Sequence, residues 1–295
     1  MCRLFGMHTG HHPAKASFWL LRAPNSLELQ SHYEPDGTGI GSFAADGSPF
    51  ISKQPISAWH DPEFAFEAKH LESTTFLAHV RYASTGGHTP ENTHPFVQDG
   101  RLLAHNGVLG GLDELDSRLS LLGTSELVLG QTDSERMFAL ITAEIRRAAG
   151  DVAAGIAAAL TWIAENLPVY SLNFILTTPT DLWALRYPAT HELYVLERRI
   201  GRNAPSEDLR MHSDRIHAHS PELAARSSVI VATEMMSADP AWRPLEPGEL
   251  LHVDRALGVE SSFPLPGNPL RLMTLEQLDP KTAASQHPQT HVRPS

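Results

Sequence analysis

Short apolar runs with alternating or β-branched residues predict β-strands in the first third of the chain. Residues 2–8, 74–84 and 101–111 have this character. Residues 39–44 lie between two Asp-Gly dipeptides and are expected to form one strand of a hairpin. The run at 101–111 is expected to end in a tight turn at Asn106-Gly107, because this dipeptide favours hairpin turns.

Helical periodicity occupies the middle of the chain. Residues 132–148 begin with a capping pattern and continue with apolar residues spaced three to four apart, and residues 151–167 form an Ala-rich segment. A shorter helix is expected over 61–72, where Asp61 precedes a proline. Further apolar runs predict strands at 170–178, 182–187, 191–199, 227–235 and 248–255. Strands followed by helices and then by more strands indicate an α+β fold rather than alternating βαβ units.

The composition of the chain disfavours several classes of function. The formal net charge is −11, which disfavours binding to nucleic acid or to an anionic membrane. No apolar stretch is long enough to predict a membrane span, and the start of the chain is too polar for a secretory signal. The single cysteine cannot form an internal disulfide, so we expect a cytoplasmic protein.

That single cysteine, Cys2, directly follows the initiator methionine. Removal of Met1 would give Cys2 a free α-amine, a group with an ordinary pKa of about 7.7–8.0. One residue would then supply both a thiol nucleophile and a general base, as N-terminal threonine does in other enzymes. The alternative is that Cys2 is a small apolar residue opening the first strand.

Two further motifs carry groups that suit acyl-transfer chemistry. Arg81 stands near the end of an apolar strand, where its forked donors could bind a carboxylate or form a surface salt bridge. Asn106 and Gly107 could form only a turn, or could aim an amide and a backbone N–H at one oxyanion.

The helix start at 132–135 adds a carboxylate. Thr132 and Glu135 fit a capping box, which does not need Asp133. Asp133 could bind the ammonium group of an amino-acid substrate. A ligand with an α-carboxylate, an α-ammonium and a distal carbonyl satisfies all these groups, so we expect glutamine or another γ-glutamyl compound as the small-molecule substrate.

The motifs occur in an order that resembles class II, N-terminal nucleophile glutamine amidotransferases. They are "MC", "DGTGIG", "HVRYAST", "ENTHPF", "AHNG" and "TDSE". The chain is similar to a stand-alone subgroup that includes the γ-glutamyl hydrolase of ergothioneine biosynthesis. The resemblance implies an amidotransferase domain over residues 2–263, and a C-terminal extension over 264–295 whose end we expect to be disordered.

The resemblance also implies a four-layer αββα sandwich and a role for each matching residue. Cys2 would attack the γ-carbonyl, with its own α-amine as base, and form a γ-glutamyl-thioester. The other roles implied are an oxyanion hole of Asn106 and Gly107, an α-carboxylate site of Arg81, Ser84 and Thr85, and an α-ammonium site at Asp133.

Several alternatives stay open from the sequence. The chain could hydrolyse a γ-glutamyl compound, or could act as a glutaminase subunit that delivers ammonia to a partner enzyme. It could also bind a γ-glutamyl ligand without turnover. The seventeen histidines, three of them within residues 8–12, raise the possibility of a metal site, but no His-Glu-x-x-His or Cys-x-x-Cys spacing supports it. We expect neither a metal nor another cofactor.

Overall fold

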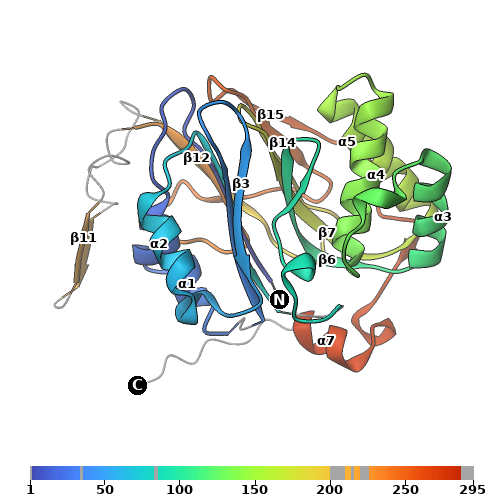
Figure 1. Ribbon diagram of the computed structural model, residues 1–295, viewed down its shortest axis with the longest axis horizontal. Helices are drawn as coiled ribbons and strands as arrows, with labels where there is room; N and C mark the ends of the chain where they lie inside the picture. Colours follow the sequence, from blue (N-terminus) through green and yellow to red (C-terminus); the bar gives the residue numbers. More distant parts are fainter. Residues whose placement is uncertain are drawn as a thin grey trace.

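A computed structural model describes residues 2–33, 36–82, 86–199, 210–213, 216–219 and 226–286. Figure 1 shows two large β-sheets lying face to face, with helices on the outer side of each. Most of the strands and helices expected from the sequence are present, and their bounds follow here by layer.

The first sheet places β1 at its centre. Its strand order is β13-β9-β12-β1-β4-β2-β3, and every neighbouring pair is antiparallel. The strands are β1 Arg3–His8, β2 Gly37–Phe43, β3 Pro49–Gln54, β4 Thr75–Arg81, β9 Tyr194–Arg198, β12 Ser228–Ala232 and β13 Arg243–Pro244. Every residue of β1, β2 and β4 is buried, because both faces of the sheet are covered.

The second sheet has the order β15-β14-β8-β7-β6-β5, with β16 added in parallel to β7. Its strands are β5 Phe96–Gln98, β6 Arg101–Leu109, β7 Pro168–Thr177, β8 Leu182–Leu185, β14 Leu250–Val253, β15 Val259–Ser262 and β16 Arg271–Leu272. A separate two-stranded ribbon consists of β10 Arg210–Ser213 and β11 Ile216–His219.

Helices cover the outer face of each sheet (Figure 1). The first sheet is covered by η1 Phe18–Arg22, α1 Leu27–Gln30, η2 Ala58–His60 and α2 Pro62–His70. The second sheet is covered by α3 Leu112–Leu122, α4 Asp133–Arg147 and α5 Val152–Asn166. The remaining short helices are η3 Pro90–Asn92, η4 Ser125–Leu127, η5 Leu275–Gln277 and α7 Pro280–Gln286.

Three apolar clusters hold the four layers together. One lies between the first helical layer and the first sheet and includes Trp19 and Phe64. A second lies between the two sheets and includes Leu77 and Leu182. A third, around Phe138, joins α4 and α5 to the second sheet. The architecture is therefore the expected α+β fold, a four-layer αββα sandwich.

The prediction of a turn at Asn106-Gly107 is wrong. Strand β6 continues through both residues to Leu109 and pairs with β7 along its length. A Cβ atom on Gly107 would lie 1.9 Å from the backbone oxygen of Ser171. Glycine is therefore required here by the close approach of β7, and not by a turn.

The C-terminal segment continues the fold past residue 263. Residues 264–286 contain β16, η5 and α7, and the disorder expected at the end falls on residues 287–295, outside the described residues. None of the helices in the described ranges has the length and apolar character needed to cross a membrane.

Candidate active site

Cys2 lies at the end of the first sheet where β1 begins. The register pairs Arg3 with Val80, so Cys2 comes opposite Arg81, the last residue of β4. The backbone N–H of Tyr82 donates to Sγ of Cys2 at 3.3 Å, and Sγ lies 3.5 Å from the backbone oxygen of Tyr82. Cys2 is half-buried, so the β-ladder fixes the thiol while leaving it partly accessible.

Arg81 is buried beside this thiol. Its guanidinium donates to the backbone oxygen of Gly87 at 3.1 Å. Burial lowers the pKa of Arg81, and the charges of Cys2, Asp36 and Asp133 oppose that shift. The guanidinium thus faces the site among groups of opposite charge. Ser84 and Thr85, the other residues expected at the α-carboxylate site, lie outside the described residues.

The second sheet brings Asn106 and Gly107 to the same place. Asn106 is 1% exposed, and its Nδ2 atom is buried without a hydrogen-bond partner in the described part of the chain. A buried amide donor left unpaired in a native fold normally has a functional or solvent partner. This donor is therefore available to an oxygen atom bound beside it.

Asp133 is the first residue of α4 and joins that helix to β6. Its Oδ2 accepts the backbone N–H of Leu109 at 2.9 Å, and its Oδ1 accepts the N–H of Ser134 at 2.9 Å. The expected capping box is only half formed. Thr132 accepts the N–H of Glu135 at 3.2 Å, but the Glu135 carboxylate accepts an N–H from the preceding loop at 2.6 Å instead of the Thr132 N–H.

These groups surround one small cavity of about 20 Å³. Of the residues predicted from the sequence, the structure brings together Cys2, Arg81, Asn106, Gly107 and Asp133. A cavity of this size has room for about one water molecule.

Buried histidines form a second ring of residues that sequence reasoning missed. His94 and His105 line the cavity, and the ring of His79 lies 4.3 Å from that of His94. His105 Nδ1 lies 2.9 Å from Ser134 Oγ. Burial lowers the pKa of all three, that of His79 to about 3, so these imidazoles are neutral at pH 7. The only sequence signal was their place inside three of the quoted motifs.

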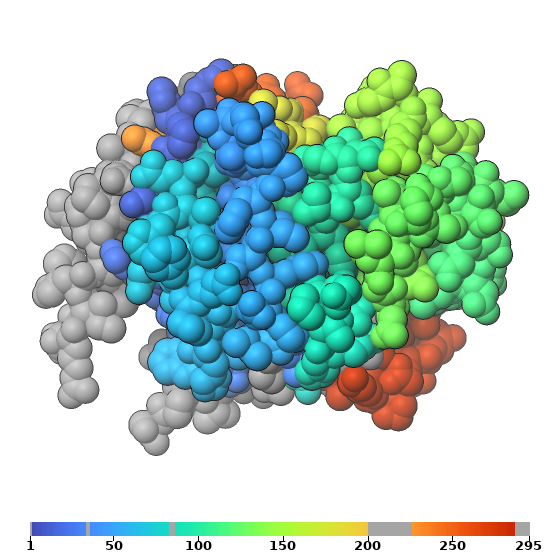
Figure 2. Space-filling model, in the orientation of Figure 1, coloured from blue at the N-terminus to red at the C-terminus, as the bar shows by residue number. Residues whose placement is uncertain are grey.

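Gln286 also lines the cavity, although it comes from α7 at the opposite end of the chain. It is 6% exposed, and its Oε1 lies 2.9 Å from Nε2 of His191. Figure 1 places α7 close to the N-terminus, and Figure 2 shows the C-terminal residues, in red, against the lower edge of the molecule. Nothing in the composition of the segment indicated this contact.

The possibility of a metal site can be tested against the side chains that the structure describes. Among them, no three His, Cys, Asp or Glu side chains are placed to bind one metal ion. His8 lies in β1, where its Nδ1 accepts the N–H of Gly10 at 2.9 Å and its Nε2 lies 2.8 Å from the Thr180 oxygen. Both nitrogens of His8 are therefore engaged within the fold.

A four-layer αββα sandwich of this kind is the N-terminal nucleophile type of fold. The sequence profile of the class-II glutamine amidotransferases matches residues 1–263. The chain belongs to this family.

Similar proteins agree with this assignment. An uncharacterized protein of Methanocaldococcus jannaschii is 27% identical over 238 residues, covering 77% of this chain and 63% of its own length. A glutamine–fructose-6-phosphate aminotransferase of Gluconobacter oxydans is 29% identical over 142 residues, covering 48% of this chain and 22% of its own. The chain therefore spans less than two thirds of these two curated relatives.

A solved class-II glutamine aminotransferase domain protein from Silicibacter pomeroyi has the same fold. Its TM-score is 0.60 at 21% identity, and the match covers 91% of this chain and 99% of that one. At this identity the likeness establishes the fold alone.

Proposed function

We propose that this protein cleaves the γ-glutamyl amide of glutamine or of a related γ-glutamyl compound, through a γ-glutamyl-thioester on Cys2. The observation that carries the proposal is the buried Nδ2 of Asn106, which has no hydrogen-bond partner among the described residues and belongs to a side chain lining the same cavity as Cys2. A donor kept without a partner beside a thiol suits the oxyanion that forms when the thiol attacks a carbonyl.

The remaining groups fit the two ends of the amino-acid part of the substrate. Arg81 is a buried guanidinium suited to the α-carboxylate, and Asp133 is a buried carboxylate suited to the α-ammonium. Both line the cavity with Cys2. The pair would orient the substrate so that its γ-carbonyl lies between the thiol and Asn106.

The proposed reaction begins after Met1 is removed. The α-amine of Cys2 takes the thiol proton as sulfur bonds to the γ-carbonyl carbon, and Asn106 Nδ2 and the Gly107 N–H stabilise the resulting oxyanion. The C–N bond then breaks as the α-ammonium returns its proton to the departing nitrogen. Water attacks the thioester, releases the γ-carboxylate and restores the thiol.

Intact mass before and after incubation with a diazo-ketone analogue of glutamine tests the proposal. We expect loss of Met1 and a single adduct, and neither adduct nor turnover in Cys2→Ala. Retained Met1 with no adduct would contradict the mechanism. An adduct of equal yield in Cys2→Ala would place the nucleophile elsewhere.

The acceptor of the γ-glutamyl group is proposed to be water. Ammonia or amine release by the purified chain, measured with glutamine and with a panel of γ-glutamyl amides, tests this choice. Adduct formation without release from any of them would favour a glutaminase subunit that turns over only with a partner enzyme. Saturable binding of a γ-glutamyl compound without adduct would favour a binding protein.

A further inference from the structure

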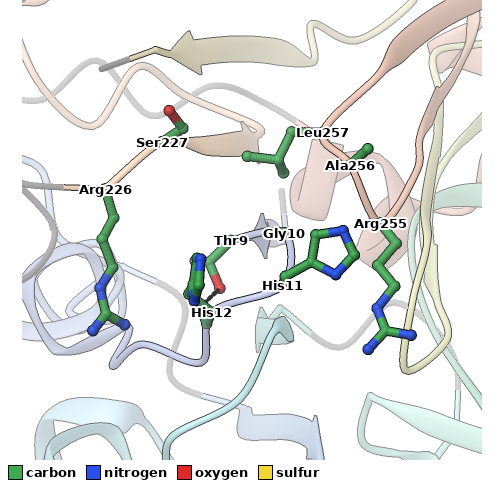
Figure 3. Close-up of a pocket in the computed structure, with 9 residues that line it drawn as sticks. All are labelled: Thr9, Gly10, His11, His12, Arg226, Ser227, Arg255, Ala256 and Leu257. Carbon is green, nitrogen blue, oxygen red and sulfur yellow. Dashed lines mark hydrogen bonds between the residues drawn. The ribbon is translucent and has the colours of Figure 1, made fainter. Parts of the chain in front are cut away.

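A larger cavity lies at the other end of β1 from Cys2. Its volume is about 520 Å³, and it is lined by residues that follow β1 and by residues 226–227 and 255–257 (Figure 3). Cys2 and Thr9 are seven residues apart along a strand, which places this cavity roughly 23 Å from the thiol. It is therefore separate from the site described above.

Arginine and histidine side chains make up four of the nine lining residues. Arg226, Arg255, His11 and His12 all contribute, and Figure 3 shows the two guanidinium groups flanking the two imidazole rings. The nine lining residues include no aspartate or glutamate. This is notable in a chain with 34 acidic and 23 basic residues, in which a surface hollow would ordinarily contain carboxylates.

The guanidinium donors in the cavity are largely unused. Arg226 donates to the backbone oxygen of Pro13, and within the described ranges Arg255 has no hydrogen bond or ion pair. A guanidinium carries five N–H donors. The cavity thus holds several charged donors that have no acceptor among the described side chains.

The carboxylates of Asp254 and Asp181 are engaged elsewhere in the fold. Asp254 precedes Arg255 in the chain, but its Oδ1 accepts the backbone N–H groups of Ala256 and Gly258, both at 2.7 Å. Oδ1 of Asp181 lies 2.8 Å from Nε2 of His252. Among the described residues, neither carboxylate pairs with Arg226 or Arg255, and the exposed guanidinium of Arg255 is open to an anion from solution.

We propose that this cavity binds a small molecule through a doubly charged oxyanion, either a phosphate or a dicarboxylate. Guanidinium groups bind both chemistries bidentately. The volume exceeds that of a bare phosphate, and Leu257 and Ala256 supply apolar surface for the rest of the ligand.

A neighbouring hollow of about 430 Å³ shows why the charge belongs in the first cavity. The two share His11 and Arg255, but the second is also lined by Asp46 and Glu72. These carboxylates would repel an anion. The charged group of the ligand is therefore placed in the first cavity, whose lining includes both Arg226 and Arg255 and, among the described residues, no carboxylate.

Isothermal titration calorimetry of the full chain at constant ionic strength tests the proposal. Inorganic phosphate, ribose 5-phosphate and succinate are the three probes. The test variant is Arg255→Gln, because the Arg255 side chain is exposed and forms no hydrogen bond or ion pair with the described residues. The matched control is Arg271→Gln, an exposed arginine that donates to a backbone oxygen at 3.1 Å on another face.

We expect at least one probe to bind at a single site, with affinity at least about tenfold weaker in Arg255→Gln and unchanged in Arg271→Gln. Tighter binding of the two phosphates identifies a phosphate ligand, and tighter binding of succinate identifies a dicarboxylate. Absence of binding of all three probes, or an equal loss in both variants, would overturn the proposal.

Discussion

Oδ2 of Asp133 accepts the backbone N–H of Leu109 at 2.9 Å, and so ties the start of α4 to the strand that carries Asn106. Asp133 also lines the cavity that contains Cys2. We expect Asp133→Asn to raise KM for glutamine about 10- to 100-fold, because a hydrogen bond to a charged group is worth about 1.5–3 kcal/mol. Steady-state kinetics checks this, with Asp113→Asn in the exposed first turn of α3 as the control. An unchanged KM would remove Asp133 from substrate binding.

Asn106→Ala separates catalysis from stability. The loss of one oxyanion donor is expected to lower kcat about 10²- to 10³-fold. Because Nδ2 has no partner within the described residues, we expect the free energy of unfolding to change by less than about 1 kcal/mol. Turnover and urea unfolding measure the two effects. Near-normal kcat, or a fall in kcat that follows unfolding, would contradict the assigned role.

The Gly107→Ala substitution, unlike Asn106→Ala, should lower the stability of the fold. Its Cβ would lie 1.9 Å from the Ser171 oxygen, so β6 and β7 must separate locally. We expect a loss of about 2–4 kcal/mol in the free energy of unfolding. Gly267→Ala is the matched control, because a Cβ there meets nothing within 4 Å, and it should stay within about 0.5 kcal/mol. Equal effects of the two substitutions would contradict this account.

The free energy of unfolding should depend on pH, because the buried histidines are neutral in the folded protein. Burial lowers the pKa of His79 from 6.5 to about 3, so between these values the unfolded chain binds a proton that the folded chain does not. Stability therefore falls as pH drops below 6.5, by about 1.4 kcal/mol per pH unit for each such histidine. Urea unfolding at several pH values between 7 and 4 measures the slope. The His79→Leu variant should lose the contribution of one proton to this slope, whereas equal slopes in wild type and His79→Leu would contradict the prediction.

Gln286 is expected to limit access to Cys2. Its side chain lines the small cavity, and its Oε1 lies 2.9 Å from Nε2 of His191. Removing one neutral hydrogen bond of about 1 kcal/mol in Gln286→Ala should favour an open site and speed alkylation by the diazo-ketone about fivefold. Lys281→Ala, on the exposed side of α7, is the control and should leave the rate unchanged. A slower rate in Gln286→Ala would instead make Gln286 part of the substrate site.

The sequence predicted those parts of the fold that depend on neighbours in the chain. The caps at Asp61 and Thr132 are short-range hydrogen bonds, and both are present. The hairpin of β2 and β3 likewise depends on a local turn at Gly47, where φ is +84°. Local patterns of this kind need no knowledge of the rest of the molecule.

Asn106-Gly107 shows where local patterns fail. The dipeptide favours a turn in isolation, but β7, more than sixty residues later, extends the strand through it. The positions of His94 and Gln286 in the cavity depend in the same way on distant partners. The chemical groups of the site could be predicted from the motifs, whereas the residues that enclose it could not.

The placement of Cys2 and Asn106 on central strands has a consequence for hydrogen exchange. β1 has a strand on both sides from Phe5 to His8, whereas β6 has β7 along its length but β5 only at residues 101–103. Amides protected on both sides exchange more slowly than those at a strand end. We therefore expect slower exchange in the middle of β1 than beside Cys2 or Asn106. A mutation that destabilises the fold without touching the site should lower the fraction of working molecules while leaving the chemistry of each one intact.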